Sequence, residues 1–179
     1  TGLGFNGLYQ SGFTQGTIGV GFDAIGLLGV KLDSGKGRAG TGLFPNGSDG
    51  RAQDDYSKGG GAIKFRISDT VLKIGDQYTT APVFASDDSR LLPELPQGVS
   101  ITSNEIKGLK LEAGHFTSIV AQSQTFKDSI SDSSDVGHVG LKEANFVGGV
   151  YSFTPELTGS LYYSKVEDYW KKTYANINW

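Results

Sequence analysis

Residues 18–32 read IGVGFDAIGLLGVKL, and this stretch decides the fold class of the chain. Its even positions, from Ile18 to Leu32, carry no charge, whereas Asp23 and Lys31 stand at odd positions. When apolar and polar residues alternate with a period of two, successive side chains lie on opposite faces of a strand. The run is also far longer than the usual strand of about five or six residues. The stretch therefore predicts one long strand with an apolar face and a polar face.

The same alternation recurs in pairs of segments that are joined by tight turns. Residues 62–68 alternate up to a turn at Asp69 and Thr70, and the pattern resumes in residues 72–74. Two similar hairpins are predicted with turns near residues 106–108 and 154–156, and segments 3–10 and 173–179 read as further strands. The chain is therefore predicted to be all-β and antiparallel, with about eight or nine strands.

Long polar loops alternate with these tight turns. They are expected at about residues 33–58, 79–98 and 117–143. In an up-and-down sheet this order places all tight turns on one rim and all long loops on the other, which is the layout of outer-membrane barrels. The sequence has no run of about 18 apolar residues that would form a transmembrane helix, whereas a barrel strand needs only about ten residues.

Composition excludes several other classes of function. The net charge of −3, with 16 basic and 19 acidic residues interspersed, provides no basic stripe for nucleic acid. The absence of cysteine removes thiolate chemistry and cysteine metal sites. The only histidines, His115 and His138, lack the spacing of metal ligands, and no Ser, His and Asp arrangement for catalysis is visible. We therefore expect no cofactor, no metal and no enzymatic activity.

The direction of the polar face separates two kinds of barrel. This face carries the basic residues Lys64, Arg66, Lys73 and Lys110 in mid-strand. In a membrane barrel the apolar face meets lipid and these residues line a watery lumen. The alternative is a soluble lipocalin-like barrel that encloses a hydrophobic ligand and turns its charges outward. The long loops favour the membrane barrel.

The segment 79–98 is unusual because it mixes apolar and charged residues. The motif Asp87-Asp88-Ser89-Arg90 is surrounded by apolar residues: Pro82, Val83, Phe84, Leu91, Leu92 and Pro93. If this loop folds into the barrel, its apolar side chains lie against the wall. Asp88, Ser89 and Arg90 then face the channel as a constriction. The alternative is a loop that packs on top of the barrel.

Several blocks of the chain resemble the OprD family of substrate-specific porins of Gram-negative bacteria. The blocks are SGFTQGTIGVGFDAIGLLGVKLDSG at residues 11–35, GRAQDDYS at 50–57, PVFASDDSRLLP at 82–93 and LYYSKVED at 161–168. The resemblance implies an 18-stranded transmembrane β-barrel in the bacterial outer membrane. This chain, residues 1–179, would be a partial barrel domain that corresponds to its N-terminal half.

The resemblance also implies a function and a site. It implies passive, selective diffusion of small carboxylate-containing solutes, small organic anions or amino acids, along an arginine-rich ladder. Arg90 would bind the carboxylate, while Asp88 and Ser89 would contact the polar end of the solute. The chain departs from this pattern because it has only four arginines and carries His115 where an arginine is often expected. The implied surroundings are outer-membrane lipid, and the implied assembly is a monomer or weak trimer.

Overall fold

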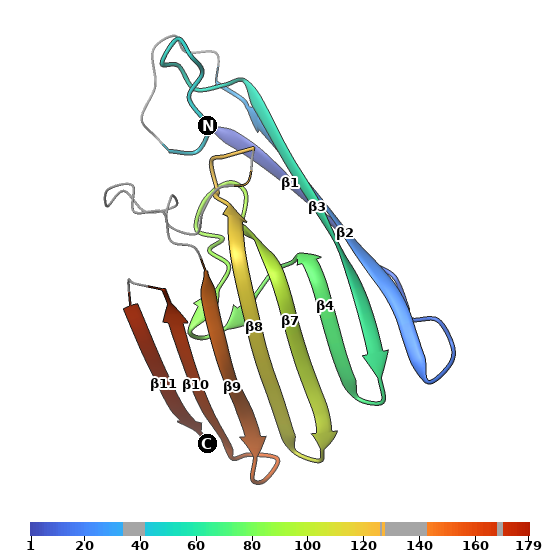
Figure 1. The fold of residues 1–179 in the computed structure, drawn as a ribbon. Helices are drawn as coiled ribbons and strands as arrows, with labels where there is room; N and C mark the ends of the chain where they lie inside the picture. The colour runs from blue at the N-terminus through green and yellow to red at the C-terminus, as the bar shows by residue number, and fades with distance from the viewer. Residues whose placement is uncertain (34–41, 126, 128–142, 168–169) are drawn as a thin grey trace.

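The computed structural model describes residues 1–33, 42–125, 127, 143–167 and 170–179. In these residues nine strands form one antiparallel sheet in chain order, which confirms the predicted fold class (Figure 1). The strands are β1 (Gly2–Gln10), β2 (Ile18–Lys31), β3 (Asp55–Ile67), β4 (Thr70–Asp76), β7 (Leu95–Ile106), β8 (Leu109–Val120), β9 (Ala144–Ser152), β10 (Thr158–Val166) and β11 (Trp170–Asn178). The short strands β5 (Thr80–Ala81) and β6 (Phe84–Ala85) pair separately. No helix in the described ranges has the length and apolar character needed to cross a membrane.

The connections separate by length as the sequence predicts, except between β10 and β11, where Val166 pairs with Trp170 and a short connection lies at the end of the sheet that carries the long loops. Short connections at residues 11–17, 68–69, 107–108 and 153–157 lie on one rim, here called the short-turn rim (Figure 1). The connections between β2 and β3 and between β4 and β7 lie on the opposite, long-loop rim. The β3–β4 turn is Ser68-Asp69, one residue earlier than predicted, because Thr70 already pairs with Ile67. Most of the loop predicted at 117–143 lies outside the described residues.

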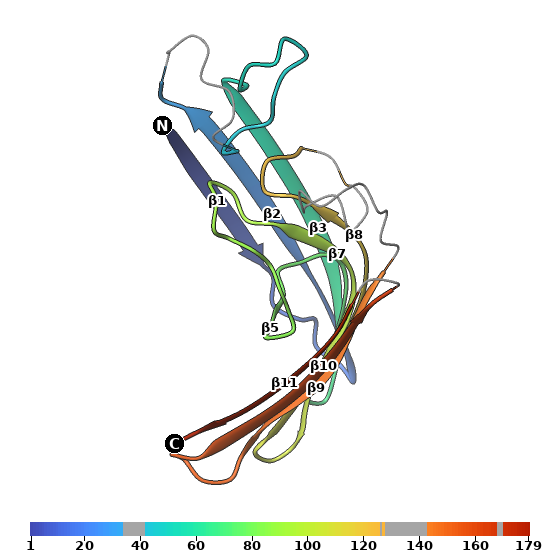
Figure 2. The ribbon, with the colours of Figure 1, turned by 90° about the vertical axis from the view of Figure 1, so that its left-hand side faces the viewer.

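The sheet is curved, and the β4–β7 connection lies on its concave side (Figure 2). Alternate residues of β2 are exposed on the convex face and buried on the concave face. Phe22 is 52 % exposed, whereas its neighbour Asp23 is only 4 % exposed. Val20 and Leu28 are exposed as well. The apolar residues therefore point away from the concave side and the charged ones point toward it, as expected for a membrane barrel.

Two apolar clusters attach the β4–β7 connection to the concave face. Ala81 and Val83 belong to a buried cluster with Phe116, Phe146 and Tyr162. Farther along the connection, Leu92 belongs to a second buried cluster, whose other members include Ile25, Leu27, Phe44, Tyr56 and Leu95. Burying these side chains provides the driving force that holds the segment against the strands. The segment is thus a packed part of the concave face.

Candidate functional site

The concave face carries a cluster of one carboxylate and two lysines. Asp23 of β2 accepts from Lys64 of β3 at 2.7 Å through Oδ1, and it contacts Lys73 of β4 at 2.6 Å through Oδ2. The side chains of Asp23 and Lys64 are almost fully buried. The register explains the cluster, because Lys64 pairs with both Gly21 and Lys73. One anion between two cations leaves the cluster with a formal charge of +1.

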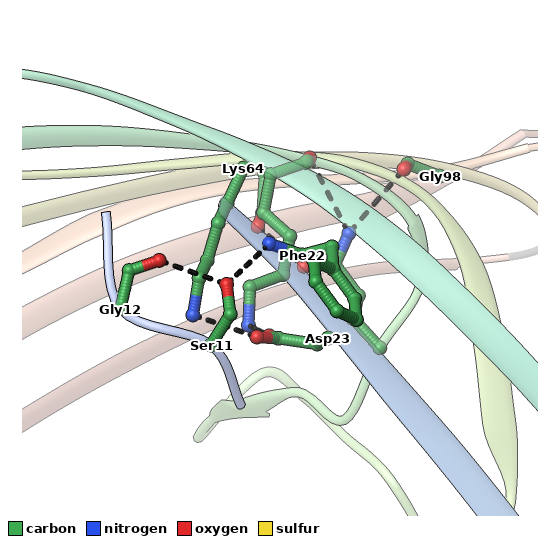
Figure 3. Close-up of polar contacts among 9 residues, drawn as sticks. Ser11, Gly12, Phe22, Asp23, Lys64 and Gly98 are labelled. Atoms are coloured by element: carbon green, nitrogen blue, oxygen red, sulfur yellow. Dashed lines mark hydrogen bonds and ion pairs between the residues drawn. The ribbon is translucent and has the colours of Figure 1, made fainter. Parts of the chain in front are cut away.

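The connection between β1 and β2 folds over this cluster. Ser11 accepts a hydrogen bond from the backbone N–H of Phe22 at 2.7 Å and donates to the carbonyl of Gly12 (Figure 3). A glycine at position 21 is needed there, since a Cβ at that site would lie 2.5 Å from the Gly12 carbonyl. The segment therefore lies directly against Lys64.

Arg66 lies beside the same connection, toward the short-turn rim. Its guanidinium stacks over the Phe13 ring at 4.9 Å, and the Lys64 ammonium lies 5.1 Å from the same ring. Such cation–π contacts orient a cation without neutralising it. Arg66 is exposed and makes no ion pair with any described residue.

Lys110 and Glu112 form a second charged group on β8. Lys110 contacts Glu112 at 2.7 Å, and the Tyr162 hydroxyl of β10 donates to the other oxygen of Glu112 at 2.6 Å. Glu112 was not among the residues that sequence reasoning selected for the site. The sequence could have indicated Glu112, because it lies two residues after Lys110 and therefore on the same polar face of β8.

A cleft of about 190 Å³ lies between these groups, with Lys73 and Glu112 both in its lining. The β4–β7 connection contributes to its wall through Gln77, whose Oε1 accepts from Ser100 at 2.5 Å. Thr102 adds another hydroxyl. Gln77, Ser100 and Thr102 were missed by sequence reasoning, since their importance arises only when the connection packs on the sheet. Cationic, anionic and neutral polar groups thus meet in one cleft.

The motif Asp88-Ser89-Arg90 lies elsewhere, near the long-loop rim. Arg90 donates from Nη1 to the Gly42 carbonyl at 2.7 Å, and its neighbour Leu91 packs close to Gly29. Gly29 is eight residues from Gly21 along β2, which corresponds to about 26 Å. The structure therefore does not bring Arg90 together with Lys64 and Lys73. Asp88 is exposed.

The turn that carries this motif is fixed by hydrogen bonds within the connection. The backbone N–H of Ser89 donates to Asp87 Oδ1 at 2.8 Å, and this bond lowers the pKa of the Asp87 carboxyl. The N–H of Glu94 donates to the Asp87 carbonyl at 2.8 Å. Burial raises the pKa of Glu94, despite the nearby Lys58. The two ends of residues 87–94 are thus held together.

His115 lies on the convex face of β8 and is exposed. It is therefore not part of the concave basic lining. His138 lies outside the described residues. Among the residues that the structure describes, no group of three or more His, Cys, Asp or Glu side chains is arranged to hold a metal ion.

Comparisons with known proteins agree with this geometry. The family model described as outer membrane porin, OprD family, matches residues 1–179. Porin D of Pseudomonas aeruginosa is 46 % identical over 176 residues, which are 98 % of this chain and 40 % of Porin D. The porin-like protein GalP of Pseudomonas putida is 38 % identical over 170 residues, which are 94 % of this chain and 41 % of GalP.

A solved structure shows the same fold. The crystal structure of Pseudomonas aeruginosa OpdK with vanillate superimposes with a TM-score of 0.88 at 38 % identity, covering 97 % of this chain and 45 % of OpdK. The chain thus spans less than half of the length of each of these three relatives. The crystal structure of OpdK therefore shares the fold of this chain.

Proposed function

Because the chain belongs to the OprD family of porins and lies in the bacterial outer membrane, we propose that it provides the charged wall of a passive channel for small carboxylates. The observation that carries this proposal is the cleft that joins Lys73 and Glu112. A solute carboxylate is attracted to the +1 cluster of Asp23, Lys64 and Lys73. The Glu112 carboxylate repels a second anion and accepts a hydrogen bond from a donor group of the solute.

The basic residues supply successive contacts along the concave face. Arg90 is the proposed first contact near the long-loop rim, with Asp88 and Ser89 beside it. One N–H of its guanidinium is used by Gly42, which leaves other donors free for a carboxylate. Lys73 follows in mid-strand, and the buried Lys64 adds its charge from behind. Arg66 lies nearest the short-turn rim, and its exposed guanidinium is the last contact.

The nature of the permeant is supported by charge and by a relative. The field of paired opposite charges in a narrow cleft favours small anions that also carry neutral polar groups. Vanillate, the ligand in the OpdK crystal structure, is such an aromatic carboxylate. A soluble lipocalin-like carrier is not favoured, because Phe22 and Leu28 are exposed while Asp23 and Lys64 are buried. Assembly as a monomer or weak trimer stays a prediction.

The proposal is tested by comparing fluxes of vanillate and uncharged vanillyl alcohol into liposomes that contain the purified protein. Lys73→Gln should lower vanillate flux about tenfold, because one attractive charge is lost at close range, and it should leave vanillyl alcohol flux unchanged. Arg90→Gln should lower vanillate flux in the same direction. Arg51→Gln, in an exposed loop beside Asp49, is the matched control. Equal vanillate flux through wild type and Lys73→Gln would refute selection at the cleft.

A further inference from the structure

A row of polar side chains crosses the convex face near the long-loop rim. The strand register places His115 opposite Asn145, Asn145 opposite Lys165, and Lys165 opposite Lys171. These residues come from β8, β9, β10 and β11, which lie side by side (Figure 1). Ser164, the neighbour of Lys165, is buried on the concave side. We call these four residues the outer polar row.

The convex face between this row and the short-turn rim is apolar. Tyr163 and Val147 are opposite each other and exposed, and the next row contains Leu161 opposite Gly149. An apolar groove of about 890 Å³ lies across the same four strands, with Leu111, Tyr151, Leu161 and Ile177 in its walls. Barrels of this class keep their long loops outside the cell. The outer polar row therefore marks the boundary of the outer leaflet, and the groove extends from the depth of Leu161 to Phe153 at the short-turn rim.

The two halves of the outer polar row differ in how their charges are satisfied. Asn145 donates to Glu143 at 3.1 Å and contacts His115 Nδ1 at 2.7 Å, which leaves that half compensated. Lys165 and Lys171 form no hydrogen bond or ion pair with any of the described residues. Like charges directly opposite in a sheet are destabilising. Their pairing at a membrane boundary favours a bound anion, and none of the described residues supplies one.

We propose that Lys165 and Lys171 bind a phosphate group of a phosphorylated glycolipid of the outer leaflet, of the lipid A type. The phosphate lies between the two ammonium groups and accepts hydrogen bonds from both. An acyl chain of the same lipid extends toward the short-turn rim and enters the nearer end of the apolar groove at Leu161. Leu161 is four residues from Lys165, about 13 Å along the strand, which suits a headgroup above and a chain below. The lipid thus fixes the outer half of β10 and β11.

Native mass spectrometry of the intact protein in detergent micelles tests this site with purified lipid A. The double substitution Lys165→Gln and Lys171→Gln should weaken lipid A binding about 30-fold, because two attractive charges at the membrane surface are lost. Lys107→Gln, an exposed lysine in the β7–β8 turn on the opposite rim, should leave binding unchanged. The difference in gel migration between heated and unheated samples should be the same for all variants. This result would show that each variant forms a folded barrel.

Two further arms identify the source of the phosphate. Dephosphorylated lipid A should bind the wild type as weakly as lipid A binds the double variant, and inorganic phosphate should not displace lipid A. Unchanged lipid A binding by the double variant, or equal binding of the dephosphorylated lipid, would overturn the proposal. Protein dimers that disappear only in the double variant would also overturn it, because the row would then bind a second copy of the chain.

Discussion

Asp23 is the residue on which the charge of the concave cleft depends most directly. Its carboxylate lies between Lys64 and Lys73 at 2.7 and 2.6 Å. Removing one partner from a buried ion pair leaves an uncompensated charge and costs about 3 kcal/mol of stability. Without this anion the two lysines contribute a charge of +2 in place of +1. Asp23 therefore sets both the stability of the β2–β4 region and the strength of the attraction for anions.

Asp23→Asn is accordingly expected to make the channel more selective for anions. Planar bilayers with a KCl gradient measure this as a shift of the reversal potential toward the chloride equilibrium potential. The melting temperature should fall at the same time, because the lysines repel each other. Asp49→Asn, which removes an exposed loop carboxylate, should change neither quantity. An unchanged reversal potential in Asp23→Asn would show that this cluster does not face the ion path.

Glu94 makes the stability of the β4–β7 connection depend on pH. Because burial raises the pKa of this carboxyl in the folded protein, its ionised form is disfavoured there. The folded state therefore loses stability as pH rises through the ordinary value of 4.5 and up to the raised value. Below 4.5 the carboxyl is protonated in both the folded and the unfolded state, and this loss is absent.

Glu94→Gln should remove this loss. The melting temperature of the variant, followed by circular dichroism, is expected to exceed that of the wild type by about 2 °C at pH 7 and to match it at pH 4. Glu156→Gln, in the exposed β9–β10 turn, is the control and should behave as wild type at both values. A difference that is the same at pH 4 and pH 7 would contradict the role of ionisation.

At the scale of elements, the β1–β2 connection and the β4–β7 connection both pack on the concave face. Their packing requires glycine at positions where a connection closely approaches a strand. A Cβ at position 21 would lie 2.5 Å from the Gly12 carbonyl and 2.8 Å from Lys64 Cε, whereas a Cβ at Gly26 would meet nothing within 4 Å. Both glycines belong to β2. Gly21 and Gly26 therefore form a matched pair, because the β1–β2 connection covers Gly21 and no described residue covers Gly26.

Gly21→Ala should destabilise the protein by about 1–3 kcal/mol, because the new methyl group forces the β1–β2 connection away from the strand. Gly26→Ala should be neutral or slightly stabilising, since alanine has less backbone freedom to lose on folding. Thermal unfolding in detergent measures both. Cleavage of residues 11–17 by protease should also increase in Gly21→Ala. Equal stability of the two variants would show that the connection does not depend on close contact at position 21.

For the whole molecule, the direction of the apolar face determines how the protein sits in its membrane. Leu161 is 62 % exposed in mid-strand on the convex face, and Leu32 is equally exposed (61 %) at the long-loop end of β2. Leu161→Arg should cost about 2–4 kcal/mol, because it places a charge at the depth of the hydrocarbon, whereas Leu32→Arg should cost about 0–1 kcal/mol. Urea unfolding in lipid vesicles measures the difference. Similar costs at both positions would argue against a lipid-facing convex surface.

The strands, the hairpins and the division of strand residues between two faces were predictable from the sequence. These features depend on neighbours along the chain, because a period of two separates the two faces and short polar segments such as Lys107-Gly108 mark the turns, although the β3–β4 turn lies one residue earlier than predicted. Lys64, Lys73 and Lys110 could be assigned to one common face in this way, whereas the period alone did not say that this face is the concave one.

Which charges meet became visible only in the folded sheet. Asp23 and Lys73 are 50 residues apart in sequence, and they meet because β2, β3 and β4 pair in one particular register. The positions of Arg90 beside Gly42, of Gln77 in the cleft and of Lys165 opposite Lys171 likewise follow from loop docking and strand pairing. Such contacts depend on how segments that are far apart in sequence pack together, and the pattern of neighbouring residues does not predict this packing.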